Sequence, residues 1–203
     1  MKKTAAVLLV IFLIALFSQT GVAQDKALVE EIARYVKKID SPSKRSTEPD
    51  LVFADISQNG GPRWRKFSSS KSLEKFRQEK AETYCISNNW LRKGKIIVSV
   101  FTLFSESGDW ANYVYYYFRE DGTLAKIEAE YRTFYGNFAA ATSIFFNSKG
   151  KVIKKSVKYF DLAGNPAKPS ADYLRENSPM MNDFGYYKTT GKLPFYHLLK
   201  AKK

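Results

Sequence analysis

The chain has 203 residues, 44% of them hydrophobic and 26% charged, which is enough to bury a core without disulfide bonds or metal ions. Basic residues outnumber acidic ones by 33 to 20, giving a formal net charge of +13. The single cysteine, Cys85, excludes an intramolecular disulfide, and together with the single histidine it excludes a zinc site built from several Cys and His ligands.

Residues 1–23 carry two lysines, an uncharged apolar run from Ala5 to Phe17 and a stretch of small residues that ends at Ala23. This order is typical of a secretory signal peptide that is cleaved near Ala23. The apolar run is shorter than the roughly 20 residues that a membrane-spanning helix needs. We therefore expect an exported protein, periplasmic or secreted, which does not span the membrane after cleavage and has no nucleic-acid partner.

Residues 24–40 are predicted to form an amphipathic helix that Asp25 can cap. Its apolar residues recur at helical spacing opposite charged ones, namely Leu28, Ile32, Tyr35, Val36 and Ile39. Residues 41–50 form a polar linker without periodicity. The apolar stripe of the helix is therefore a candidate cover for a sheet formed by the residues that follow.

Several short elements are predicted between the linker and residue 90. Leu51–Ile56 has the composition of a strand, and Arg63–Phe67 is its predicted return partner after a turn at 59–62. Ser72 is predicted to cap a short helix. A further strand from about residue 82 to residue 90 leads into the most regular part of the chain.

Six glycines recur at an unbroken spacing of 14 residues, namely Gly94, Gly108, Gly122, Gly136, Gly150 and Gly164. Apolar, β-favouring residues flank them, which is typical of strands joined by tight turns. The loops that end in Gly122 and Gly150 fit a three-residue hairpin, in which glycine alone takes the left-handed conformation without steric cost. Residues 51–166 are therefore predicted to form a mainly β domain, a curved antiparallel β-meander of about seven or eight strands with helical cover. A closed up-and-down barrel is the alternative.

Three-residue loops pair residues of equal parity, so the faces of the strands follow from counting after each glycine. The count places Tyr113 and Ile127 on one buried face, whose centre carries small Ala and Ser side chains. The same count surrounds that hollow with an aromatic wall formed by Phe101, Tyr113, Tyr115, Tyr117, Tyr131 and Tyr159. These six residues are the candidate site for a small apolar or amphipathic ligand. The alternative is that the N-terminal helix or another covering element fills the hollow.

Beyond Gly164, two closely spaced prolines end the strand pattern. A helical turn is predicted at Ala171–Arg175 and a last short helix at Pro194–Lys200. The apolar residues within 167–203 predict that this C-terminal segment docks onto the apolar part of the second sheet face, with a mobile tail as the alternative.

No group of residues has the spacing of a catalytic, metal or cofactor site, so we expect neither a metal nor a cofactor. A hydrolase would need Ser72, Cys85 or His197 to converge in one cleft. Cys85 lies in an apolar run, which predicts a buried, inert thiol, with an intermolecular disulfide as the alternative. The sequence therefore favours a non-enzymatic protein over a hydrolase with an unrecognised site.

Without Lys2 and Lys3 of the signal peptide, 31 basic residues remain against 20 acidic ones, a formal charge of +11. A basic exported protein favours an anionic partner, which can be an envelope protein, anionic lipid or acidic polysaccharide. Lysines concentrate modestly at 149–158 and 200–203, so solvated surface charge is the alternative. The leading hypothesis is an exported non-enzymatic protein that acts by binding, and the second is a carrier of a small apolar ligand in the sheet hollow.

Overall fold

The structure, a computed structural model, describes residues 24–40, 47–57, 61–80 and 82–200. Eight antiparallel strands form a single open sheet in the order β2-β1-β3-β4-β5-β6-β7-β8. The predicted meander is therefore confirmed, and the sheet does not close into a barrel. The predicted signal peptide, most of the linker and part of the turn at 59–62 lie outside the described residues.

The strands are β1 (Leu51–Asp55), β2 (Trp64–Phe67), β3 (Cys85–Arg92), β4 (Lys95–Phe104), β5 (Trp110–Phe118), β6 (Leu124–Thr133), β7 (Phe138–Phe146) and β8 (Val152–Phe160). The helices are the N-terminal helix (described from 24 to 39), α2 (Ser70–Glu79), α3 (Ala171–Met181), the short 3₁₀ turn η1 (Thr190–Lys192) and α4 (His197–Lys200). No helix within the described ranges is long and apolar enough to cross a membrane.

Three helices differ from their predicted limits. Helix α4 begins at His197, three residues after the predicted start at Pro194, and the other two differ for local reasons. The side chain of Ser69 caps α2, and the predicted cap residue Ser72 is instead its reciprocal partner in a capping box. Helix α3 continues well beyond the predicted turn at Ala171–Arg175, and it tolerates Pro179 in its last turn.

All six regularly spaced glycines lie at chain reversals and have φ values between 69° and 91°. Gly122 and Gly150 each close a three-residue loop, as predicted. The flanking residues are paired directly, since the N–H of Arg119 donates to the carbonyl of Thr123 and that of Asn147 to the carbonyl of Lys151. Gly108 and Gly136 instead sit in four-residue loops, 106–109 and 134–137. From Gly108 to Gly150 the loops therefore alternate between four and three residues, while the loop at Gly94 has two residues and the loop at Gly164 has three.

Three strands contain an extra residue that has no partner on the neighbouring strand. These β-bulge residues are Ile97, Ala125 and Ile153, which are spaced 28 residues apart. The bulges at Ala125 and Ile153 follow the two three-residue loops and shift the pairing by one residue. Beyond these two bulges odd residues pair with even residues, whereas Phe118 still pairs with Leu124 and Phe146 with Val152 next to the loops. The four-residue loops give the same odd-to-even pairing between β4 and β5 and between β6 and β7.

This pairing overturns the predicted assignment of the strand faces. Tyr113 pairs with Glu130, whereas Ile127 pairs with Tyr116, so Tyr113 and Ile127 lie on opposite faces of the sheet. We call the face that carries Tyr113 the helix face and the face that carries Ile127 the tail face. The prediction failed because it assumed three-residue loops and unbroken pairing at every reversal.

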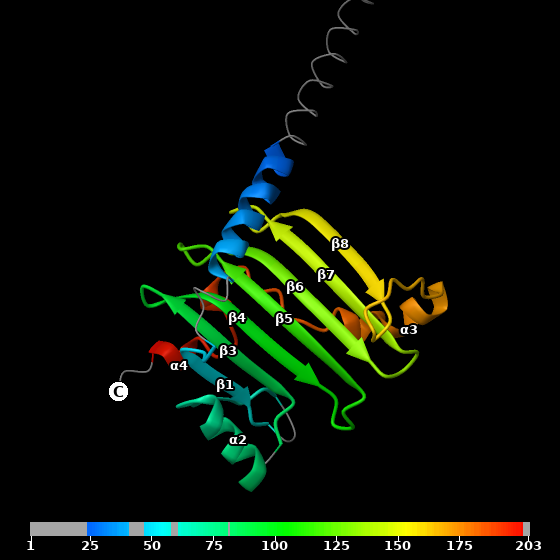
Figure 1. Ribbon diagram of the computed structural model, residues 1–203. Helices are drawn as coiled ribbons and strands as arrows, with labels where there is room; N and C mark the ends of the chain where they lie inside the picture. Colours follow the sequence, from blue (N-terminus) through cyan, green and yellow to red (C-terminus); the bar gives the residue numbers. More distant parts are fainter. Residues whose placement is uncertain (1–23, 41–46, 58–60, 81, 201–203) are drawn as a thin grey trace, which may run out of the picture.

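The N-terminal helix covers the upper part of the helix face (Figure 1). Ile32 and Val36 pack there against Val98 and Tyr117. The hydroxyl of Tyr35 donates to the carbonyl of Phe118 at 2.6 Å. The apolar stripe predicted for this helix thus lies against the sheet.

The C-terminal segment crosses the tail face, on the other side of the sheet from the N-terminal helix (Figure 1). The ring of Phe195 stacks on that of Phe53, with 4.1 Å between centroids and an interplanar angle of 10°. Next to the loop that ends at Gly122, the N–H of Leu124 donates to the carbonyl of Lys188 at 3.0 Å. The sheet is therefore the middle layer of three.

Gly136→Ala is expected to cost more stability than Gly108→Ala, although both glycines have a positive φ. Alanine in the left-handed conformation costs about 1–2 kcal/mol at either position. At position 136 the added Cβ would also lie 2.8 Å from the ring of Tyr173, whereas nothing lies within 4 Å of the Cβ added at 108. Urea unfolding of the two variants should show the difference. Equal losses would contradict the close packing of α3 on the turn between β6 and β7.

Phe195→Ala is expected to destabilise the fold by about 3–5 kcal/mol, because it empties a fully buried site between layers. Phe134→Ala is the control. The side chain of Phe134 is 75% exposed, so its loss should change the free energy of unfolding by no more than about 0.5 kcal/mol. Denaturant titration measures both values, and a small effect of Phe195→Ala would show that the C-terminal segment is not part of the cooperative core.

Candidate functional site

The six aromatic residues predicted as one ligand-binding wall are divided between the two faces of the sheet. Three of them, Tyr113, Tyr115 and Tyr117, lie on the helix face. Their directly paired neighbours on β6 are charged, namely Glu130, Glu128 and Lys126. Tyr117 is buried beneath the N-terminal helix, while Tyr113 is 37% exposed. This row runs from the core to the solvent and does not enclose a cavity.

The other three aromatic residues, Phe101, Tyr131 and Tyr159, lie on the tail face. Phe101 packs against Phe195 and Tyr187 of the C-terminal segment, with ring centroids 5.9 and 5.7 Å apart. Tyr131 and Tyr159 belong to a separate cluster near α3. The chain's own C-terminal segment therefore covers the centre of this face, where the hollow was predicted.

The structure does not join the three candidate hydrolase residues. The hydroxyl of Ser72 donates to the carbonyl of Ser69 within the cap of α2, Cys85 lies on β3, and His197 begins α4. No hydrogen bond links these three side chains within the described ranges. Burial raises the pKa of the Cys85 thiol to about 12, with further contributions from Asp55 and Asp183. Cys85 therefore stays protonated, and unsuited to nucleophilic attack, at neutral pH.

The raised pKa of Cys85 predicts a loss of stability at alkaline pH. An acid that is harder to ionise in the folded state stabilises the fold fully below its unfolded pKa, near 9.0, and loses that contribution as the pH rises toward 12. The free energy of unfolding should fall more steeply above pH 9 in the natural protein than in Cys85→Ala, by up to about 1.4 kcal/mol per pH unit. Parallel slopes in urea titrations at several pH values would contradict the assignment.

Strand β8 forms one edge of the sheet and carries a concentration of positive charge. Within 147–160 five side chains are basic, none is acidic, and all five are exposed, namely Lys149, Lys151, Lys154, Lys155 and Lys158. None of them forms an ion pair with another described residue. Two apolar side chains lie among them, Val152 at 44% and Val157 at 38% exposure. This edge therefore carries a local excess of exposed positive charge.

The outer side of β8 also presents backbone groups without a neighbouring strand. The carbonyl of Tyr159 points outward, because it accepts from the N–H of Ala167 at 3.0 Å. Alternate residues of a strand turn their N–H and C=O groups to the same edge, so those of Val157 and Lys155 also point outward. No backbone hydrogen bond fills these two positions from any other part of the described chain. The edge can therefore pair with an added strand.

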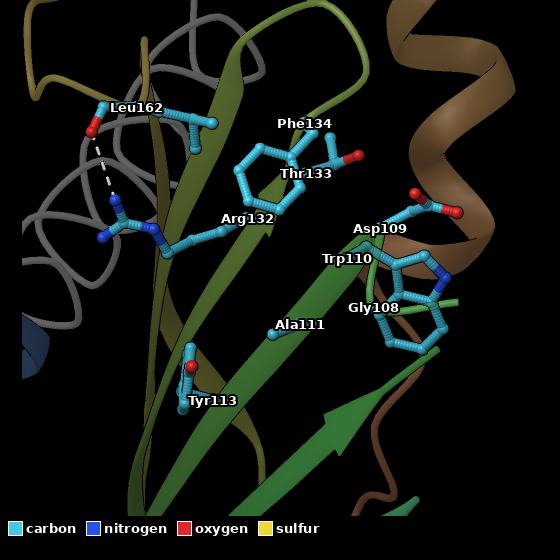
Figure 2. A pocket seen from close by; sticks show the side chains of 9 residues that line it. All are labelled: Gly108, Asp109, Trp110, Ala111, Tyr113, Arg132, Thr133, Phe134 and Leu162. Atoms are coloured by element: carbon cyan, nitrogen blue, oxygen red, sulfur yellow. Dashed lines mark hydrogen bonds between the residues drawn. The ribbon is translucent and has the colours of Figure 1, made fainter. Parts of the chain in front are cut away.

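A groove of about 340 Å³ opens on the helix face where β5 begins and β6 ends (Figure 2). Tyr113, Phe134 and Leu162 supply its apolar surface. Arg132 extends along it and donates to the carbonyl of Leu162 at 3.2 Å, while also pairing with Glu130 at 2.9 Å. The charge of Arg132 is thus already compensated, and the groove offers mainly a shallow aromatic contact.

Acidic side chains are not gathered as a metal site, since no group of three or more His, Cys, Asp or Glu among the described residues is placed to hold an ion.

Comparison of the chain with protein-family models, curated proteins and solved structures finds no match. The chemistry of the described surface is therefore the basis for a functional proposal.

Proposed function

We propose that this protein is an exported, non-enzymatic binding protein that recognises an acidic, extended segment of an envelope protein at the free edge of β8. The observation that supports the proposal is that β8 carries three exposed lysines, with two more in the turn before it, together with outward backbone groups that lack a partner. Export is proposed from the pattern of residues 1–23.

The backbone groups favour a protein segment over the other anionic partners. A lipid surface or an acidic polysaccharide can neutralise the lysines, but neither supplies the regular row of amide donors and acceptors that the edge of a sheet can bind. An added strand satisfies the N–H and C=O groups of Lys155 and Val157 while it places acidic side chains beside the lysines. Both features of the edge are then used at once.

The two faces of β8 specify an alternating pattern in the partner. Lys154 and Lys158 lie on the helix face, because they pair with Phe145 and Ala141. Val157 lies on the opposite face beside Lys155, and its exposed side chain can contact an apolar side chain there. Since directly paired side chains on one face interact, a ninth strand should carry acidic residues toward the helix face and apolar residues toward the tail face.

Lysines on an edge strand also have a simpler role, because they prevent one copy of a sheet from pairing with another. That role and the proposed one share a physical cause. The charges that repel a second lysine-rich edge attract an acidic strand, so protection against aggregation does not itself argue against recognition. The two roles differ in whether an acidic strand binds, which can be measured.

The test uses a labelled peptide in which glutamate and valine alternate, and a peptide of the same composition in which they form two blocks. The alternating peptide should bind more tightly, as measured by fluorescence anisotropy at low salt. Binding should slow hydrogen exchange at the amides of Lys155 and Val157, whose N–H groups point outward. Equal affinity for the two peptides would contradict strand addition.

Two double variants distinguish binding at the β8 edge from an effect of the protein's net charge. Replacing Lys154 and Lys158 by glutamate should weaken binding about tenfold, because several exposed ion pairs are lost. The matched control replaces Lys37 and Lys38, exposed residues of the N-terminal helix, and changes the net charge by the same amount. An equal loss in the control would show that only net charge matters. Tighter binding of phosphatidylglycerol vesicles or polygalacturonate than of the peptide would assign the edge to lipid or polysaccharide instead.

A further inference from the structure

A second, larger hollow of about 600 Å³ lies on the tail face, between α3 and the ends of β5 and β6. Aromatic side chains from four separate segments line it, together with the thioether of Met180. These are Trp110, Tyr131, Tyr135 and Tyr173. Only Tyr131 belongs to the aromatic site predicted from the sequence.

Local packing holds three of these rings in place, whereas Tyr135 is 67% exposed. Trp110 is the first residue of β5, and its ring centroid lies 6.1 Å from that of Tyr131 on β6. The hydroxyl of Tyr173 donates to the carbonyl of Tyr135 at 2.6 Å, which ties α3 to the turn between β6 and β7. Gly136 allows this approach because it has no side chain to meet the ring of Tyr173. Trp110, Tyr131 and Tyr173 are thus in position before any ligand arrives.

The charged residues that line this hollow are both acidic, although the whole chain is strongly basic. They are Asp109 and Glu176, and neither forms an ion pair with another described residue. The nearest arginine along α3, Arg175, is paired with Asp172 at 3.0 Å. Asp109 accepts a hydrogen bond from the hydroxyl of Ser107, which leaves its negative charge uncompensated.

Asn177 adds an uncharged acceptor to the same lining. The residue is 9% exposed, and its Nδ2 donates to the carbonyl of Tyr173 at 2.9 Å. No donor among the described residues reaches its Oδ1. This atom is accessible to solvent, so it can accept a hydrogen bond in the hollow but does not itself require a ligand.

We infer that this hollow binds an organic cation, specifically a quaternary ammonium group. The negative faces of aromatic rings attract such a group, and its methyl groups fill an apolar space without the hydration that a primary ammonium must retain. The two carboxylates supply the opposite charge at the rim. A metal ion is disfavoured, because the lining carries only two carboxylates and no group of three or more His, Cys, Asp or Glu among the described residues is placed to hold an ion.

This inference does not rest on the acidic-segment proposal for β8. The hollow and the β8 edge share no residue, and they select ligands of opposite charge. Failure of one proposal therefore leaves the other standing.

The test titrates the protein with choline and with 3,3-dimethylbutan-1-ol, its neutral isostere of nearly equal shape. Choline should shift the NMR resonances of the Trp110 indole and the Gly136 amide, and should bind at least several-fold more tightly than the alcohol. Equal affinity for the two compounds would overturn the inference in favour of a merely apolar site. Absence of any shift at these residues would overturn it altogether.

Variants locate the site and check its charge. Glu176→Gln should weaken choline binding about threefold or more, whereas Asp172→Asn, which removes the same charge from the same helix outside the lining, should not. Trp110→Leu should weaken binding more than Trp110→Phe, since phenylalanine keeps an aromatic face. The thermal midpoint of each variant shows whether the fold persists. A loss in Asp172→Asn equal to that in Glu176→Gln would show long-range charge instead of a site.

The quaternary ammonium can come from a free small molecule or from a lipid headgroup. Phosphatidylcholine vesicles distinguish these sources. If the protein floats with the vesicles and free choline reverses this, the site binds the lipid headgroup. If the protein binds choline but does not float with the vesicles, the site binds the free molecule.

Discussion

One unpaired residue in each of two strands decides which side chains of this sheet meet. Ala125 and Ile153 shift the pairing after the three-residue loops, so that β5 with β6 and β7 with β8 match the odd-to-even pairing that the four-residue loops give the other strands from β4 to β8. The rows of tyrosine and of charged residues then share one face, and the apolar residues that the C-terminal segment covers share the other. The two covers and the charges along β8 all depend on this sidedness.

The reversals could be predicted from the sequence because glycine spacing marks them directly. At Gly122 and Gly150 even the type of loop follows from the residues, since a left-handed position after a type I turn favours glycine. The bulges could not be predicted in the same way. Ala125 and Ile153 are ordinary apolar residues of strands, and nothing in their chemistry distinguishes a paired residue from an unpaired one.

The two candidate sites also differ in how far the sequence predicts them. The lysines between 149 and 158 are neighbours in sequence, so their concentration was visible before the fold was known. The aromatic hollow is assembled from the start of β5, the end of β6, the following turn and α3. Trp110 and Tyr173 meet there only through tertiary packing, and no spacing rule connects a strand residue with a helix that begins after the last strand.

The bulge residues recur every 28 residues, twice the spacing of the glycines, so the repeating unit of the architecture is a hairpin and not a strand. A gene duplication that inserted one such hairpin would widen the sheet and leave both surfaces matched to their existing covers. Insertion of a single 14-residue strand would turn the side chains of every later strand to the opposite face of the sheet. It would also reverse the direction in which each later strand runs. Lineages related to this protein should therefore differ in size by whole hairpins.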